Sequence, residues 1–78
     1  MQNQTGSTRY AEVDISAKVR AVAGEYRVSQ ERLGDIIGVQ RGGIVRRLNG
    51  TTQWSAREIA ILADHFGQPI ARFYGDVA

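Results

Sequence analysis

The fold is decided by residues 29–50, which read SQERLGDIIGVQRGGIVRRLNG. A helix is expected at about 29–37, because Ser29 is a good N-cap and Gly38 can end a helix in the left-handed conformation. Three apolar side chains should form the buried side of this helix: Leu33, Ile36 and Ile37. No alternating strand pattern competes with a helix here.

A second helix is expected from about residue 40 to residue 49. Ile44 and Leu48 give it an apolar edge at i, i+4, and Gly50 can end it. Gly34 is small where the second helix must cross the first closely. Two short helices around a tight turn have the spacing of a helix-turn-helix, whose second helix enters the major groove of DNA.

A helix is also expected before this stretch, with Asp14 as its N-cap. Its apolar stripe has the spacing i, i+4, i+7, i+8 and i+11 and consists of Ile15, Val19, Val22, Ala23 and Tyr26. Residues 1–13 lack this periodicity and are expected to be a flexible arm. The helix-turn-helix domain is therefore predicted to span residues 14–78.

Two helices are expected after this stretch. Ser55 and Glu58 form a capping box, and Trp54 and Ile59 occupy the hydrophobic-staple positions around it. The helix that follows should bury Ile59, Leu62, Ala63 and Phe66 and end at Gly67. Pro69 suits the first turn of a last short helix with Ile70, Phe73 and Tyr74. The predicted class is all-α, a compact bundle of about five short helices.

Composition limits the other function classes. The chain has 78 residues, no Cys and one His, and its apolar runs are short. Disulfides and thiolate metal sites are excluded, and neither a membrane span nor a signal peptide is expected. Without a nucleophile–base pair or a metal cluster around His65, we expect no enzyme, cofactor or small-molecule ligand. The expected location is the cytoplasm of a bacterial cell or a phage-infected host.

The charge is unevenly distributed along the chain. Net charge is only +2, and nine of the ten basic residues are Arg. Residues 1–35 sum to zero, residues 36–57 carry +4 with no acidic residue, and residues 58–78 carry −2. A stretch of 22 residues without a carboxylate suits a surface that faces a polyanion. Chance in an Arg-biased composition is the alternative.

The predicted second helix has an outward face without a carboxylate. This face consists of Gln40, Arg41, Gly42, Val45, Arg46 and Asn49. An Arg side chain can pair with O6 and N7 of guanine through two hydrogen bonds. The alternative is an ordinary solvated helix face.

The sequence resembles the phage-repressor and Cro-like helix-turn-helix family, the xenobiotic-response-element or lambda-repressor-like type. The resemblance covers about residues 15–74 and is carried by Ser29-Gln30, Leu33, Ile37-Gly38-Val39, Ile44, Gly50, Trp54-Ser55, Leu62-Ala63 and Phe66-Gly67. It implies that Gln30 holds a backbone phosphate and that Asn49 touches phosphate beyond the recognition helix. It also implies that Gln40, Arg41, Gly42 and Arg46 face base edges.

Other positions leave alternatives open. Val45 belongs to the expected base-reading face. Further candidates for phosphate contacts are Ser29, Arg47, Thr51 and Thr52. Ser29 can instead be a simple cap, and the two Thr side chains can be polar loop residues.

The chain departs from the family pattern at two places. Common members carry an apolar residue at the position of Arg47 and a polar one at that of Leu48. Arg47 can therefore grip phosphate or lay its stem along the edge of the core. At Gly42-Gly43, where many members have Ser, Thr or Gln, the glycines allow either close approach of the backbone to DNA or tight helix packing.

Together these patterns predict a sequence-specific double-stranded DNA-binding protein, most simply a phage-type repressor or another transcriptional regulator. A homodimer on a pseudo-palindromic operator is expected, since lone modules of this kind bind weakly. Ile70, Phe73 and Tyr74 are the candidate dimer surface, although they can equally be needed to close the core. The alternative function is an antitoxin or excision accessory factor that uses the same fold to bind a protein.

Overall fold

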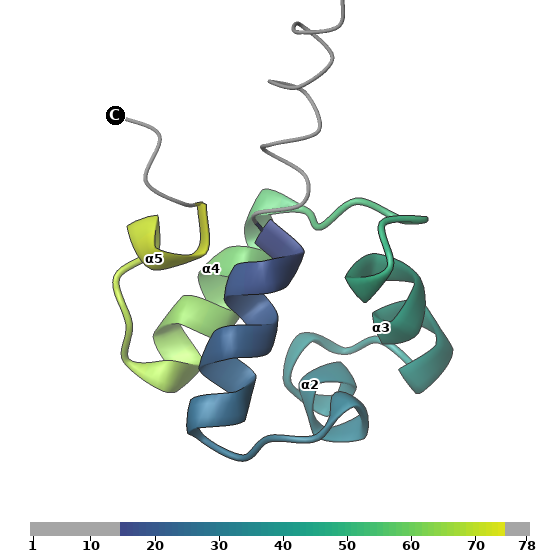
Figure 1. Cartoon of the computed structure of the whole chain (residues 1–78), viewed down its shortest axis with the longest axis horizontal. Coiled ribbons are helices and arrows are strands. Elements are labelled where there is room, and N and C mark those ends of the chain that lie inside the picture. Colours follow the sequence, from purple (N-terminus) through teal and green to yellow (C-terminus); the bar gives the residue numbers. More distant parts are fainter. Residues whose placement is uncertain (1–14, 75–78) are drawn as a thin grey trace, which may run out of the picture.

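Five helices make up most of residues 15–74, the part of the chain that this computed structural model describes (Figure 1). The first, called here the N-terminal helix, is helical over residues 15–25. The others are α2 (Gln30–Ile37), α3 (Arg41–Leu48), α4 (Ala56–Phe66) and α5 (Ala71–Tyr74). The predicted all-α class is confirmed, with no strand among these residues. The predicted arm at 1–13 and the N-cap Asp14 lie outside the described residues.

The predicted caps of α2 and α4 are confirmed in the structure, whereas Pro69, expected in the first turn of the last helix, precedes α5. The Ser29 hydroxyl caps α2 by accepting a hydrogen bond from the Arg32 amide at 3.1 Å. Gly38 ends α2 with a φ of +79°, a conformation that favours glycine. The predicted capping box of Ser55 and Glu58 starts α4. These contacts satisfy helix-end groups that water would otherwise have to solvate.

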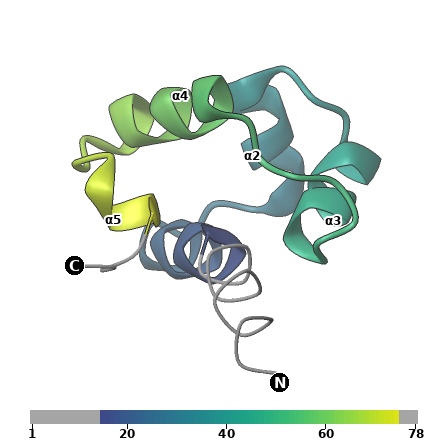
Figure 2. The same ribbon diagram turned by 90° about the horizontal axis from the view of Figure 1, so that it is seen from above.

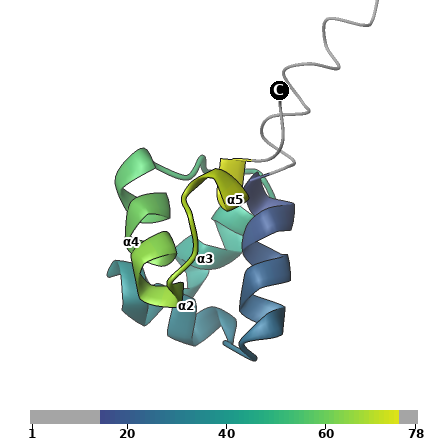
Figure 3. The ribbon, with the colours of Figure 1, turned by 90° about the vertical axis from the view of Figure 1, so that its left-hand side faces the viewer.

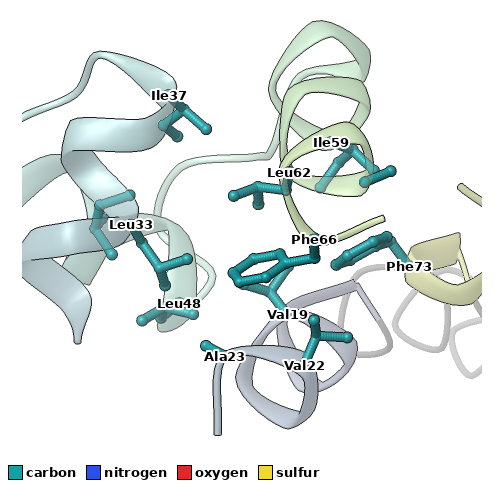
Figure 4. Packing of buried hydrophobic residues seen from close by; sticks show 12 residues of the cluster. Val19, Val22, Ala23, Leu33, Ile37, Leu48, Ile59, Leu62, Phe66 and Phe73 are labelled. Atoms are coloured by element: carbon teal, nitrogen blue, oxygen red, sulfur yellow. The ribbon is translucent and has the colours of Figure 1, made fainter. Parts of the chain in front are cut away.

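All five helices contribute side chains to one hydrophobic core (Figure 4). The buried residues are Val19, Val22, Ala23, Leu33, Ile37, Ile44, Leu48, Ile59, Leu62, Ala63, Phe66 and Phe73. No charged or polar side chain in residues 15–74 is buried with them. The predicted apolar stripes therefore face one another, and their burial is the main term that stabilises the fold.

Tyr26 differs from expectation, and Phe73 follows one of the two alternatives that the sequence left open. Tyr26, predicted in the buried stripe, is 46% exposed because the N-terminal helix ends one residue earlier. Its ring stacks on Phe66 with centroids 5.0 Å apart. Phe73, a candidate for the dimer surface, is fully buried and closes the core. Of that predicted surface only Ile70 and Tyr74 are exposed, at 45% and 37%.

The helices surround the core so that α3 and α5 lie at opposite ends of the molecule (Figures 1 and 2). α2 packs against both α3 and α4. α5 lies between the N-terminal helix and α4 (Figure 3). No helix in residues 15–74 has the length and apolar character needed to span a membrane. The arrangement leaves the outer side of α3 free of other helices.

Replacing Gly34 by Ala tests the close contact between α2 and the turn that follows it. A Cβ on Gly34 would lie 2.2 Å from the Val39 carbonyl oxygen, whereas one on Gly24 would meet nothing within 4 Å. Gly34→Ala should destabilise the protein by about 2 kcal/mol or more through overpacking. The control Gly24→Ala should stabilise it by up to about 1 kcal/mol. Urea unfolding measures both, and equal effects of the two variants would contradict the packing.

Candidate functional site

The position of α3 on α2 depends on two glycines with no room for a side chain. Besides the Val39 oxygen, a Cβ on Gly34 would meet Cγ1 of Ile44 at 3.4 Å. A Cβ on Gly43 would lie 2.3 Å from Cγ1 of Val39. The amides of Gly38 and Val39 both donate to the Gly34 carbonyl, at 2.7 and 2.8 Å. Gly43 is therefore explained by tight packing, one of the two alternatives that its sequence allowed.

The side of α3 opposite the core is exposed as predicted. Its exposed residues, together with the caps at both ends, are Gln40, Arg41, Gly42, Val45, Arg46 and Asn49. α3 contains no acidic residue, so this face carries only positive charge from its own side chains.

Gly42 differs from its neighbour Gly43 in its surroundings. A Cβ on Gly42 would meet only Nη1 of Arg46, at 3.7 Å. Packing therefore does not require a glycine here. The absent side chain leaves the backbone of α3 open to solvent beside the Arg46 guanidinium, in the middle of the exposed face.

The start of α2 lies next to the start of α3. Ser29, Gln30, Glu31 and Arg41 line a shallow groove of about 270 Å³. Three of the predicted DNA contacts are thus brought together from two helices. Glu31 also lines the groove, so its carboxylate reduces the positive potential beside Arg41. Glu31 lies outside the carboxylate-free stretch 36–57, so the charge pattern of that stretch does not show that a carboxylate lies near Arg41.

The predicted phosphate contacts after α3 also stabilise the end of that helix. Oδ1 of Asn49 accepts hydrogen bonds from the Thr51 amide at 3.0 Å and the Thr51 hydroxyl at 2.7 Å. The amides of Thr51 and Thr52 donate to the Arg46 carbonyl. Asn49 and Thr51 are exposed and Thr52 is half-buried. These hydrogen bonds link the side chains of Asn49 and Thr51 to each other and to the end of α3.

The guanidinium of Arg47, one of the candidate phosphate contacts, is bound within the protein. Nε and Nη2 donate to the two carboxylate oxygens of Glu58, each at 2.9 Å, and Nη1 donates to the Gly43 carbonyl at 3.0 Å. The side chains of Arg47 and Glu58 are only 15% and 12% exposed. The second alternative from the sequence, a stem along the edge of the core, is closer to the structure.

Three residues outside the predicted site hold the other end of α3. The Ser16 hydroxyl donates to the Arg47 carbonyl at 2.9 Å, and the Arg20 guanidinium donates to the Leu48 carbonyl at 3.2 Å. The Trp54 indole N–H donates to the Ser16 oxygen at 3.1 Å. The Ser16 and Arg20 contacts bind carbonyls at the end of α3, which find no partner among the helix's own amides. No local sequence pattern could identify them, because they join residues about 30 or more positions apart.

The ion pair of Arg47 and Glu58 should make stability pH-dependent. Hydrogen bonds from Arg47 lower the pKa of Glu58 below its ordinary value of 4.5. The stabilisation is therefore complete above pH 4.5 and is lost as pH falls through the lower folded-state pKa. Glu58→Gln, which can still form a capping box, should cost about 1 kcal/mol at pH 7. Urea unfolding should show this difference shrinking in acid, whereas a difference independent of pH would contradict the pair's role.

Residues 15–74 contain no group of three or more His, Asp or Glu side chains arranged to hold a metal ion. His65 lies in the last turn of α4, exposed, with its ring edge-on to Phe66 at a centroid distance of 5.1 Å.

Comparison of the chain with known protein families, curated proteins and solved structures finds no significant match.

Proposed function

We propose that this protein binds double-stranded DNA in a sequence-specific manner and regulates transcription, as a phage-type repressor or Cro-like protein does. In this proposal α2, the turn at 38–40 and α3 form a helix-turn-helix, with α3 as the recognition helix. The observation that carries the proposal is the outward face of α3. Two unpaired arginines, Arg41 and Arg46, and no carboxylate lie on this side of the helix, which no other described helix covers.

Phosphate contacts would come from residues near both ends of α3 and would set the position of the protein along the duplex. Ser29 and Gln30 lie at the start of α2, in the same groove as Arg41. Asn49 and Thr51 lie beyond the other end of α3, in the turn that their mutual hydrogen bonds fix. A duplex that meets both groups of side chains would lie across the outward face of α3.

Base contacts would come from the middle of that face. Arg41 and Arg46 have the geometry for two hydrogen bonds each to guanine, and Gln40 can pair with adenine. Val45 is 40% exposed and can contact the methyl group of thymine. Gly42 would let the backbone of α3 come close to the base edges. The preferred half-site should therefore contain guanines spaced for Arg41 and Arg46.

A homodimer is the form in which such a module would bind a two-fold operator. Two copies of α3 would then lie about 34 Å apart, one turn of the DNA helix. Ile70 and Tyr74 are exposed on the α5 side, away from α3, so a second copy could contact them without covering the DNA-binding face.

The same apolar residues favour a second candidate function. Tyr26, Ile70 and Tyr74 are three of the four large hydrophobic residues that are exposed within residues 15–74. Hydrogen bonds join this region, since Gln68 donates to the Tyr26 hydroxyl and Arg72 pairs with Glu25. A protein-binding role as an antitoxin or excision accessory factor would use this side of the molecule.

Selection of duplexes from a random pool tests DNA binding directly. The wild-type protein should enrich one motif, and its affinity for that motif should fall steeply with salt. Arg41→Ala and Arg46→Ala should each reduce specific binding by about 5- to 150-fold, the range for one bidentate contact, with a much smaller loss on random DNA.

Arg57→Ala is the control, because Arg57 is an exposed arginine on α4, outside the α3 face. It should change specific and random binding by the same factor. An unenriched pool would contradict the proposal and favour the protein-binding alternative. Equal losses on both DNAs for the α3 variants would contradict base reading.

Gly42→Ala should separate stability from binding. The added methyl group meets no close neighbour, so the folded protein should gain up to about 1 kcal/mol in stability from the better helix propensity of Ala. Binding to the selected duplex should weaken, because the methyl group keeps the backbone of α3 away from the bases. Thermal unfolding and fluorescence anisotropy measure the two effects. Unchanged or tighter binding would show that close approach at Gly42 is not used.

A further inference from the structure

We propose that the ion pair of Arg47 and Glu58 positions α3 for base reading, and that Arg47 does not contact DNA. This inference rests on the proposed function and deepens it. It assigns adjacent arginines on one helix to different tasks, since Arg46 is exposed on the outward face while Arg47 is turned inward.

Arg47 is held by three hydrogen bonds in two directions. Two of them form a fork to the carboxylate of Glu58 on α4, and the third returns to the Gly43 carbonyl on its own helix. A forked guanidinium–carboxylate pair restricts orientation as well as distance. The pair therefore resists rotation of α3 about its own axis, the motion that would turn Arg41 and Arg46 away from their targets.

Glu58 is itself held in place at the start of α4. Its Oε1 also accepts a hydrogen bond from the Ser55 amide at 3.1 Å, and its own amide donates to the Ser55 hydroxyl at 3.1 Å. The next residue, Ile59, is fully buried in the core. Glu58 is thus tied to the first turn of α4 and to the core behind it, so Arg47 connects α3 to a rigid part of the molecule.

Gly43 provides the space in which Arg47 folds back. A Cβ on Gly43 would lie 3.2 Å from Nη1 of Arg47 as well as 2.3 Å from the Val39 side chain. The same missing side chain thus allows α3 to approach the turn and the guanidinium to reach the Gly43 carbonyl. The packing of α3 and the ion pair depend on one another at this position.

A phosphate role for Arg47 is disfavoured by charge and exposure. Its positive charge is neutralised by a carboxylate at 2.9 Å, and most of its side chain is shielded from solvent. A phosphate would have to compete with Glu58 for the guanidinium. A lysine could still serve as a point charge for phosphate, but it could not form the planar fork to Glu58.

Two substitutions distinguish positioning from phosphate contact, using the duplex that the wild-type protein selects. For Arg47→Met, specific binding should fall by about tenfold or more while random binding and the slope of log affinity against log salt stay unchanged. Arg47→Lys should show the same loss of specificity although it keeps the charge. Arg57→Met removes an exposed charge near Glu58 and is the matched control, expected to keep the ratio of specific to random binding.

Each other outcome contradicts the positioning role. A salt slope reduced by about 0.9 in Arg47→Met, with binding retained in Arg47→Lys, would assign Arg47 to phosphate. If Arg47→Met lost affinity equally for specific and random DNA, and circular dichroism showed a matching loss of folded protein, the pair would only stabilise the fold.

If the protein does not bind DNA at all, the wild-type protein will select no duplex, which distinguishes that result from a failure of the positioning role. The mechanical part of the inference is still tested without DNA. Arg47→Met should raise amide hydrogen exchange across α3 more than across α5. Equal exchange in α3 of both proteins would show that the pair does not hold the helix.

Discussion

The close approach of α3 to the turn after α2 is the constraint on which the rest of the structure depends. Gly34 and Gly43 face Val39 from two helices, and a Cβ on either would lie within 2.3 Å of an atom of that residue. With this contact in place, Ile44 and Leu48 enter the core and the opposite side of α3 faces solvent. A side chain at either glycine would push α3 outward and change what its face presents.

Charge on the surface follows from how the helices pack and not from the local sequence alone. The four arginines between residues 36 and 57 differ in their surroundings, since Arg47 is paired with Glu58 while Arg41 and Arg46 are exposed on α3. Glu31 lies near Arg41 in the groove between α2 and α3. The stretch therefore contributes three exposed arginines rather than four, and two of them, Arg41 and Arg46, lie on α3.

Most of the fold could be predicted because its signals are local. Capping residues, left-handed glycines and apolar spacing all act within one or two turns of a helix, and the bounds of α2 and α3 agree with prediction to within a residue. The partner of Arg47, the choice between a buried and an exposed Phe73, and the exposure of Tyr26 could not be predicted in this way. Each depends on which elements meet in space, and Glu58, the acidic partner of Arg47, lies one position beyond the carboxylate-free stretch 36–57.

The central claim is that the outward face of α3 is the surface that contacts DNA. Its most direct test is to follow the backbone amide resonances of the labelled protein while the selected duplex is added. The largest shifts should fall on residues 40–46 and on Ser29 and Gln30, with little change near Ile70 and Tyr74. Shifts confined to the α5 side, or an α3 face that does not respond, would contradict the claim.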